Sequence, residues 1–173
     1  NRVFKILDHS EFIKDEGKLK PDIIDGTVSF KKIEFSYDSK NQVFKDFNLN
    51  IKAGEKVAIV GSTGSGKTTI VNLLLRFYEL DKGEILIDGK NIKEMSIGLL
   101  RSNISLVSQN IFLFADSIYN NIVLYNKKIS INKVVEAAKK IGIHNFITKL
   151  PNSYNYNVKE RGIMLSEGQK QLI

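Results

Sequence analysis

The sequence predicts an α/β fold in which a strand-rich first part is followed by a helical last part. From Val28 to Tyr37, apolar side chains alternate with polar ones, which is the period of a half-buried strand. Residues 57–60 form a short apolar run that leads through a glycine-rich loop into residues 70–78, a segment of helical character. Beyond Phe114 the strand pattern stops, and apolar residues recur at helical spacing.

The first part is expected to contain short strands separated by turns. The first strand has a phase slip at Lys31 and Lys32, which indicates a β-bulge. Other strands are predicted where short apolar runs lie between turn residues such as Gly54 or the pair Asp88-Gly89. The predicted strands cover residues 28–37, 43–51, 57–60, 84–87 and 104–107, and a short helix is predicted over 96–102.

The last part is expected to be helical. Helices are predicted over residues 117–125, 131–141 and 143–150, and Pro151 ends the third of them. After a polar, Asn-rich loop, Leu165 opens a last helical run. His9 and His144 lie apart from any metal-like cluster in the sequence, and both are interpreted as structural or surface residues.

Composition narrows the possible functions. The 173 residues include no cysteine, which excludes disulfides and cysteine-based metal or nucleophile chemistry. Apolar runs are only a few residues long, so neither a membrane span nor a secretory signal is expected within this sequence. The formal net charge is +7, but the lysines are scattered and form no basic stripe with interleaved aromatic residues. No nucleic-acid partner is therefore expected.

Residues 59–69, Ile-Val-Gly-Ser-Thr-Gly-Ser-Gly-Lys-Thr-Thr, carry the strongest functional signal. They satisfy the P-loop pattern, Gly-x4-Gly-Lys-Ser/Thr between a strand and a helix. Glycines let backbone N–H groups converge on phosphate oxygens, and the helix start directs its unpaired N–H groups at the same anion. Lys67 is expected to reach the β- and γ-phosphates, and the Thr68 hydroxyl to ligate Mg²⁺. The predicted nucleotide-binding residues of the loop are Gly61, Ser62, Thr63, Gly64, Ser65, Gly66, Lys67, Thr68 and Thr69.

Further short segments surround this loop in order. Phe35-Ser36-Tyr37 precedes it, and Val107-Ser108-Gln109, Glu160-Arg161-Gly162 and Leu165-Ser166-Glu167-Gly168-Gln169 follow it. With these segments, nearly the whole chain resembles the nucleotide-binding domain of an ABC transporter, of the exporter type that carries a fused membrane domain and moves drugs, lipids or peptides. The last pentapeptide is similar to the family's signature motif, which kinases, GTPases and helicases lack. The resemblance implies a P-loop NTPase (RecA-like) core with an N-terminal antiparallel β subdomain and a helical insert subdomain.

The resemblance also implies a division of the chain. Residues 1–22 would be a linker from an upstream membrane domain, 23–112 the P-loop and β core, and 113–173 a helical subdomain that ends at the signature motif. The polar composition of residues 8–22 agrees with a linker. The family's next elements, a strand ending in Asp-Glu, a D-loop and a switch histidine, are not found, so the chain looks truncated. The 173-residue piece alone is therefore expected to be inactive.

Two site residues outside the P-loop are implied by the family. Tyr37 is expected to stack on adenine; the alternative for an aromatic residue at a strand end is a place in the core. Gln109 is expected to touch Mg²⁺ or the attacking water. The expected catalytic residues are thus Lys67 and Gln109, and the expected metal ligands are Thr68 and Gln109.

The signature motif is expected to act on a second subunit. There the family implies that Ser166, Gly168 and Gln169 face the γ-phosphate of an ATP held by the partner's P-loop; alternatively these residues only cap a helix. Glu167 stands where the family usually has glycine, so its carboxylate is expected to point away from the phosphate. Lys159 also departs from the pattern. It precedes Glu160-Arg161-Gly162, a segment that in exporters contacts cytoplasmic helices of the membrane domains.

The function implied is that of an ATP-binding cassette that binds MgATP and, in the complete protein, hydrolyses it to drive export across a membrane. The expected partners are a second nucleotide-binding domain in a head-to-tail dimer and the transmembrane domains of the same transporter. The expected location is the cytoplasmic face of the inner cell membrane. Two alternatives stay open: a soluble ABC protein that acts on ribosomes or DNA, and a degenerate cassette that binds ATP without hydrolysing it.

Overall fold

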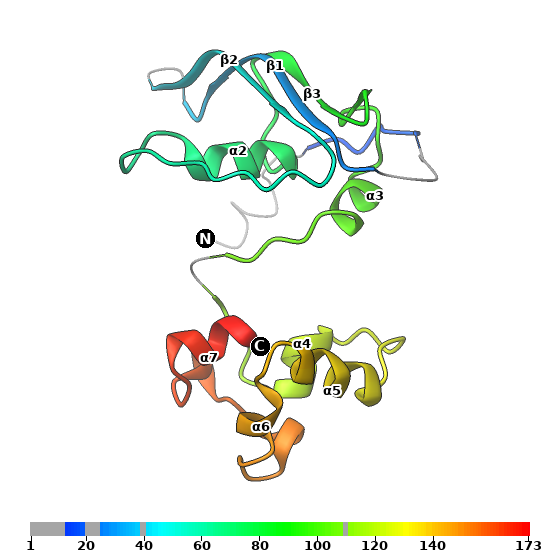
Figure 1. The fold of residues 1–173 in the computed structure, drawn as a ribbon, viewed down its shortest axis with the longest axis vertical. Helices are drawn as coiled ribbons and strands as arrows, with labels where there is room; N and C mark the ends of the chain where they lie inside the picture. The colour runs from blue at the N-terminus through cyan, green and yellow to red at the C-terminus, as the bar shows by residue number, and fades with distance from the viewer. Residues whose placement is uncertain (1–12, 20–24, 39–40, 109–110) are drawn as a thin grey trace, which may run out of the picture. The chain divides into compact units, whose positions relative to one another are not determined.

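The computed structural model describes residues 13–19, 25–38, 41–108 and 111–173 (Figure 1). The chain divides into two compact units, Asn1–Ser105 and Leu106–Ile173. The first unit holds a β-sheet with helices, and the second is built from helices. His9, much of the expected linker, and Gln109 lie outside the described residues.

An antiparallel sheet organises the first unit. Its spatial order is β2-β1-β3-β4. Its strands are β1 (Val28–Ser36), β2 (Gln42–Ile51), β3 (Lys82–Ile87) and β4 (Lys90–Asn91). The strands predicted over residues 28–37, 43–51 and 84–87 are therefore confirmed. Asp88 and Gly89 both have positive φ, 50° and 74°, which is typical of the two-residue turns that join antiparallel strands.

The bulge predicted in β1 is present. The register of β1 against β2 shifts between Phe30 and Ile33, and Lys32 has a φ of 48°. Gly83 lies directly against this bulge, because a Cβ on Gly83 would be 2.5 Å from the carbonyl oxygens of both Lys31 and Lys32. The bulged backbone thus requires glycine at the facing position of β3.

Two predicted strands are not formed. Residues 57–60 and 104–107 have no regular secondary structure, and none of the strands within the described ranges pairs with either segment. Val60 and Val107 are 88% and 73% exposed. A strand needs a neighbour that completes its backbone hydrogen bonds, and an apolar run does not reveal whether such a neighbour exists. The two strand predictions are wrong for this reason.

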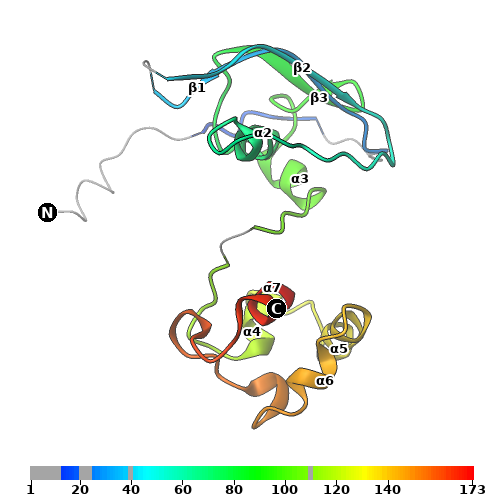
Figure 2. The ribbon, with the colours of Figure 1, turned by 60° about the vertical axis from the view of Figure 1, so that its left-hand side comes forward.

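Helix α2 (Lys67–Leu74) packs on one face of the sheet (Figures 1 and 2). Its residues Ile70 and Leu73 are buried in one core with Phe30, Ile33 and Ile85 of the strands. The helix begins and ends earlier than the predicted range of 70–78. Its start is set by the glycine-rich loop, and after its end Arg76 has a left-handed φ of 50°.

Arg101 holds the C-terminal end of α2. It belongs to α3 (Ile97–Ser102), which agrees with the helix predicted over 96–102. Its guanidinium donates hydrogen bonds to the carbonyl oxygens of Leu75 at 3.0 Å and Arg76 at 2.8 Å, and it lies 4.9 Å from the ring centroid of Phe77. Carbonyl groups at a helix end have no partner within the helix, and a cation there is favoured by the helix dipole. The helix that starts at the P-loop is thereby fixed at its other end.

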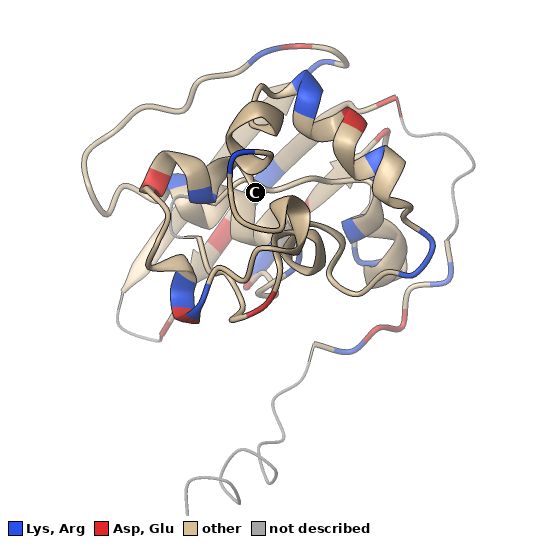
Figure 3. Cartoon of the chain, turned by 90° about the horizontal axis from the view of Figure 1, so that it is seen from below, with Lys and Arg blue, Asp and Glu red and all other residues tan. Residues whose placement is uncertain are grey.

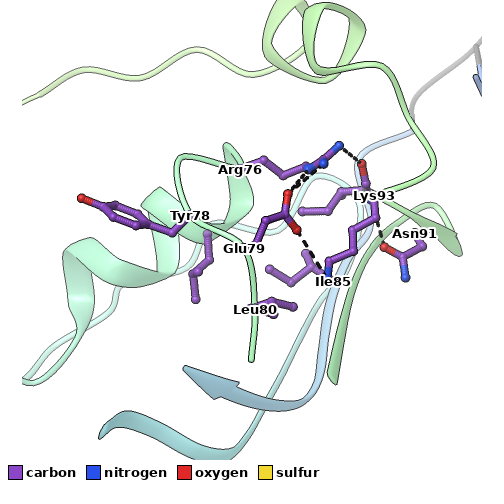
Figure 4. Close-up of a pocket in the computed structure, with 9 residues that line it drawn as sticks. Arg76, Tyr78, Glu79, Leu80, Ile85, Asn91 and Lys93 are labelled. Carbon is purple, nitrogen blue, oxygen red and sulfur yellow. Dashed lines mark hydrogen bonds and ion pairs between the residues drawn. The ribbon is translucent and has the colours of Figure 1, made fainter. Parts of the chain in front are cut away.

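Arg76 is a buried cation with a full set of polar partners (Figure 4). Its guanidinium lies 2.8 Å from Glu79 and also donates to the carbonyl oxygens of Ile92 and Met95. Lys93 lies 3.4 Å from the other oxygen of Glu79. Burial alone would raise the pKa of Glu79, but the hydrogen bond and charge of Arg76, together with Lys93, outweigh it and lower this pKa. A buried charge is costly unless paired, so Glu79 is required where Arg76 is buried.

The described part of the expected linker, residues 13–19, packs against the first unit. Leu19 forms a parallel β-bridge with Met95. Gly17 approaches the same residue so closely that a Cβ on it would overlap the Met95 carbonyl group. Asp15 accepts a hydrogen bond of 2.9 Å from the N–H of Ile97, at the start of α3. This segment is thus attached to the elements that support α2.

Asp88 attaches the chain before β1 to the turn after β3. Its carboxylate accepts hydrogen bonds from the N–H groups of Asp25, Gly26 and Thr27 at 2.8, 3.1 and 2.8 Å, and from the Thr27 hydroxyl at 2.9 Å. Partial burial by itself raises the pKa of Asp88, but these hydrogen bonds outweigh it and lower the pKa below its ordinary value.

We expect Asp88→Ala to lower the stability of the first unit by about 1–2 kcal/mol at neutral pH, since several charge-assisted hydrogen bonds are lost. The folded-state pKa lies below the unfolded one, so this stabilisation is present above the unfolded pKa and disappears as the pH falls through the folded pKa. Hydrogen exchange of the β1 amides measures the difference in stability between the unmodified protein and Asp88→Ala, at neutral and at acidic pH. A stability difference that stays constant with pH would contradict the assignment of the stabilisation to the ionised carboxylate.

The second unit is a small helical core. Its elements are α4 (Ile118–Val123), α5 (Ile131–Lys140), α6 (His144–Ile147), the short 3-10 turns Ser153–Asn155 and Glu160–Gly162, and α7 (Glu167–Leu172). These helices match the predicted ones, although α4 and α6 are shorter than the expected ranges. Ile118, Val134 and Ile147 are buried at the centre. Within the described ranges, no helix is both long enough and apolar enough to cross a membrane.

Candidate functional site

The glycine-rich loop turns sharply into α2. Ser65 donates its N–H to the carbonyl of Ser62 at 3.2 Å, and Thr63 and Gly64 form the turn between them. Gly66 is the N-cap of α2 in a left-handed conformation, with a φ of 89°, and no side chain caps the helix there. The first N–H groups of the helix are therefore available to an external acceptor, which is the arrangement that binds phosphate.

Lys67 lies across this loop. Its ammonium donates hydrogen bonds of 2.8 Å to the carbonyl oxygens of both Gly61 and Ser62. Within the loop, Gly61 lies directly against Ser65, since a Cβ on Gly61 would be 2.5 Å from the Ser65 hydroxyl oxygen. An ammonium has three donors, so two bonds to the loop leave one for a ligand.

An open pocket of about 270 Å³ lies over the start of α2. It is lined by Tyr37, Val43, Gly64, Gly66, Lys67, Thr68 and Thr69. Most of the residues predicted to contact a nucleotide from the first unit are thus brought to one place. Ser62, Thr63 and Ser65 belong to the turn of the loop, and Gly61 directly precedes it. An anion fits here because the pocket combines a cation, hydroxyl groups and an uncapped helix start.

Tyr37 forms one side of the pocket and is 47% exposed, so it is not a buried core residue. Its ring makes T-shaped contacts with the rings of Phe35 and Tyr78, with centroid separations of 4.9 Å in both cases. Its hydroxyl lies 3.1 Å from the Thr69 hydroxyl and 3.2 Å from the Asn72 side-chain nitrogen. The half-exposed ring of Tyr37 thus lies in the same pocket as the glycine-rich loop.

Sequence reasoning missed three residues near this site. Val43 lines the pocket from β2, and Asn72 and Tyr78 contact Tyr37. Asn72 could have been found, because it lies three residues after Thr69 and therefore on the same face of the helix. Gln109, predicted as a catalytic residue and metal ligand, lies outside the described residues.

The signature segment lies in the second unit. Ser166 accepts a hydrogen bond from the N–H of Gln169 at 3.2 Å, and the Gln169 side chain accepts one from the N–H of Ser166 at 2.9 Å. This reciprocal pair is a capping box, so both residues cap α7. Glu167 is 80% exposed at its side chain and pairs with Lys170 at 2.8 Å. Gly168 has open space where a Cβ would be.

The segment before α7 has an unusual backbone. Lys159, Arg161 and Gly162 have φ values of 60°, 55° and 62°. A Cβ on Gly162 would be 2.9 Å from a methyl carbon of Leu113, so glycine is needed there. The expected contact of residues 160–162 with membrane domains stays a prediction. His144 lies 2.9 Å from the hydroxyl of Tyr154, within the second unit's own structure.

The chain is similar to known proteins of one family. A family profile described as ABC transporter matches residues 44–173. An ABC transporter B family member of Dictyostelium discoideum is 42% identical over 177 residues, covering 99% of this chain and 13% of the relative. A candidate multidrug export ATP-binding/permease protein of Staphylococcus aureus is 44% identical over 171 residues, covering 98% of this chain and 30% of the relative.

A solved structure is similar as well. It is that of a bacterial Atm1-family ABC exporter with ATP bound, with a TM-score of 0.88 and 34% sequence identity. The match covers 99% of this chain and 31% of that protein, so the chain spans less than a third of the length of each of these proteins. The chain belongs to the ABC transporter family and corresponds to the ATP-binding cassette of its exporters.

Proposed function

We propose that this chain binds MgATP in the pocket over α2. The triphosphate lies against the glycine-rich loop, where Lys67 and the N–H groups at the helix start meet the β- and γ-phosphates. Thr68 ligates Mg²⁺, which would offset phosphate charge. The proposal is carried by one observation, the flat ring of Tyr37 beside a phosphate-binding loop in the same pocket. The Atm1-family structure with ATP bound supports the choice of nucleotide.

We further propose that the complete protein hydrolyses ATP to drive export. Lys67 stabilises charge on the transferred phosphoryl group, and Gln109 orients the attacking water or holds Mg²⁺. The partners are a second nucleotide-binding domain, whose P-loop would face Ser166, Gly168 and Gln169, and the membrane domains of the same transporter. The cassette would then lie at the cytoplasmic face of the membrane. These steps are supported by the exporter names of the relatives.

Glu167 is compatible with this proposal. Its carboxylate is paired with Lys170 one turn further along α7, so its negative charge is offset locally. The similarity of the chain to exporters gives no support to a soluble protein acting on ribosomes or DNA. Figure 3 shows Lys and Arg spread over several helices and loops of the side in view, with Asp and Glu among them. The absence of a nucleic-acid partner stays a prediction.

The base-stacking role is tested by Tyr37→Ala. We expect it to weaken MgATP binding by about 1–3 kcal/mol, which is the scale of base–aromatic stacking. Binding of magnesium tripolyphosphate, which has no base, should stay the same. Calorimetric titration of the full-length protein with both ligands measures the two effects separately.

Phe77→Ala is a matched control for this variant. Phe77 is a neighbouring exposed aromatic residue, 42% exposed against 47% for Tyr37, and it contacts Arg101 rather than the pocket. MgATP affinity should change less in this control than in Tyr37→Ala. Equal MgATP affinity in Tyr37→Ala and the unmodified protein would remove Tyr37 from the nucleotide site.

A further inference from the structure

Tyr37 is held by side chains that the P-loop pattern does not include. Its hydroxyl donates to the Thr69 hydroxyl at 3.1 Å and accepts from the Asn72 amide at 3.2 Å. Thr69 and Asn72 lie one turn apart on α2 and therefore on one face of the helix. The helix that starts at the phosphate-binding loop thus also holds the end of the tyrosine ring.

The ring is also constrained from its sides. Phe35 and Tyr78 both make T-shaped contacts with it, with interplanar angles of 81° and 88°, and the centroids of Phe35 and Tyr78 lie 5.9 Å apart. Phe35 is buried, whereas Tyr78 is 45% exposed and follows the end of α2. Edge-to-face contacts of this kind contribute a small stabilisation each and fix the orientation of a ring.

We infer that Asn72 and Tyr78 are positioning residues for recognition of the base, acting through Tyr37. Without them, the half-exposed ring of Tyr37 would sample other rotamers, and a ligand would have to order it on binding. Fixing a contact group before binding removes that cost and increases affinity. The inference rests on the proposed function, because it assumes that Tyr37 stacks on the base.

These contacts also link the proposed base-binding side of the site, at Tyr37, to its proposed phosphate-binding side, at the glycine-rich loop. Thr69 belongs to the P-loop segment and is 4% exposed, and its hydroxyl meets Tyr37 rather than open solvent. Asn72 lies one turn further along the helix and is half-buried. A change at Asn72 should therefore disturb the base-binding side without changing the glycine-rich loop.

The experiment is a double-mutant cycle in the full-length protein with the variants Asn72→Ala, Tyr37→Phe and the two combined. Tyr37→Phe keeps the ring but removes the hydroxyl through which Asn72 acts. Affinities for MgATP and magnesium tripolyphosphate are measured by calorimetric titration. We expect each single variant to weaken MgATP binding about threefold to tenfold, the size of one hydrogen bond, and to leave tripolyphosphate binding within about twofold. The double variant should bind MgATP no more weakly than Tyr37→Phe alone.

Tyr78→Leu tests the side contact independently. Leucine retains apolar bulk but cannot make the edge-to-face contact, so MgATP binding should weaken about twofold to fivefold with tripolyphosphate binding unchanged. Phe77→Leu is the matched control, because it changes an adjacent aromatic residue that lies by Arg101. Tyr78→Leu should therefore bind MgATP more weakly than Phe77→Leu, while the two variants should bind magnesium tripolyphosphate equally.

The outcomes separate this inference from the proposed function. If Tyr37→Ala weakens MgATP binding but Asn72→Ala and Tyr78→Leu do not, the stacking role stands and the positioning role is overturned. The inference is wrong if Asn72→Ala weakens the binding of MgATP and of magnesium tripolyphosphate equally. It is also wrong if the loss of MgATP affinity in Asn72→Ala adds fully to the loss in Tyr37→Phe. In either case Asn72 acts on the loop or on the fold. If Tyr37→Ala itself leaves MgATP binding unchanged, the proposed function of Tyr37 is lost, and the inference with it.

Discussion

Replacing Lys67 by alanine is expected to reduce MgATP affinity by about 100-fold or more. The ammonium would meet the most highly charged part of the ligand, and hydrogen bonds between charged groups contribute about 1.5–3 kcal/mol each. It also donates to the carbonyl oxygens of Gly61 and Ser62 at 2.8 Å, so the variant loses part of the loop's own support. Titration of the full-length variant with a fluorescent ATP analogue measures the loss.

Lys56→Ala is the control for the lost positive charge. Lys56 is an exposed lysine on the segment that leads into the glycine-rich loop. Lys56→Ala removes the same charge as Lys67→Ala, but Lys56 does not line the pocket and the charge of an exposed side chain is screened by salt. An Lys67→Ala variant that binds MgATP as tightly as the unmodified protein would exclude the glycine-rich loop as the phosphate site.

A series of glycine-to-alanine variants should show how tightly the loop is packed. Gly64 and Gly66 have similar left-handed φ values, 83° and 89°. A Cβ on Gly64 meets nothing within 4 Å, whereas one on Gly66 would be 2.9 Å from the ring of Phe44 and 3.1 Å from Val43. We expect Gly64→Ala to cost about 1–2 kcal/mol from backbone strain alone. Gly66→Ala should cost about 2–5 kcal/mol, because overpacking adds to the same strain.

Gly98→Ala completes the series as a control, since Gly98 lies in α3 with open space around the new Cβ. It should be neutral or stabilise the unit by up to about 1 kcal/mol, because alanine favours a helix. Hydrogen exchange of the α2 amides in the full-length proteins measures local opening. Equal protection in Gly64→Ala and Gly66→Ala would contradict the packing of Phe44 against the loop.

The fold could be predicted from the sequence where the signal is local. The alternation in β1, the slip at Lys31 and Lys32, and the turn at Asp88 and Gly89 all reflect the conformations of a few neighbouring residues. Residues 57–60 and 104–107 have an equally apolar pattern and still form no strand. Pairing depends on a second segment elsewhere in the chain, and periodicity contains no information about it.

The candidate site shows the same limit. The P-loop is one continuous segment, so its residues and their expected roles follow from spacing alone. The side chains that hold Tyr37 come from β1, α2 and the segment after α2, and only the fold brings them together. The roles of Arg76 and Arg101 depend on carbonyl groups at the ends of other elements. Contacts between segments that are distant in the sequence form only in the folded chain, so local sequence patterns do not predict them.

In the proposed complex, the base of ATP stacks on Tyr37 while its phosphates lie on the glycine-rich loop. Photolabelling of the full-length protein with an azido-adenosine triphosphate tests it directly, with the labelled peptide identified by mass spectrometry. We predict that the label attaches to the peptide that contains Tyr37, that excess MgATP prevents labelling, and that Lys67→Ala abolishes it. Labelling confined to another part of the chain, or labelling of the Tyr37 peptide that MgATP does not prevent, would contradict the claim.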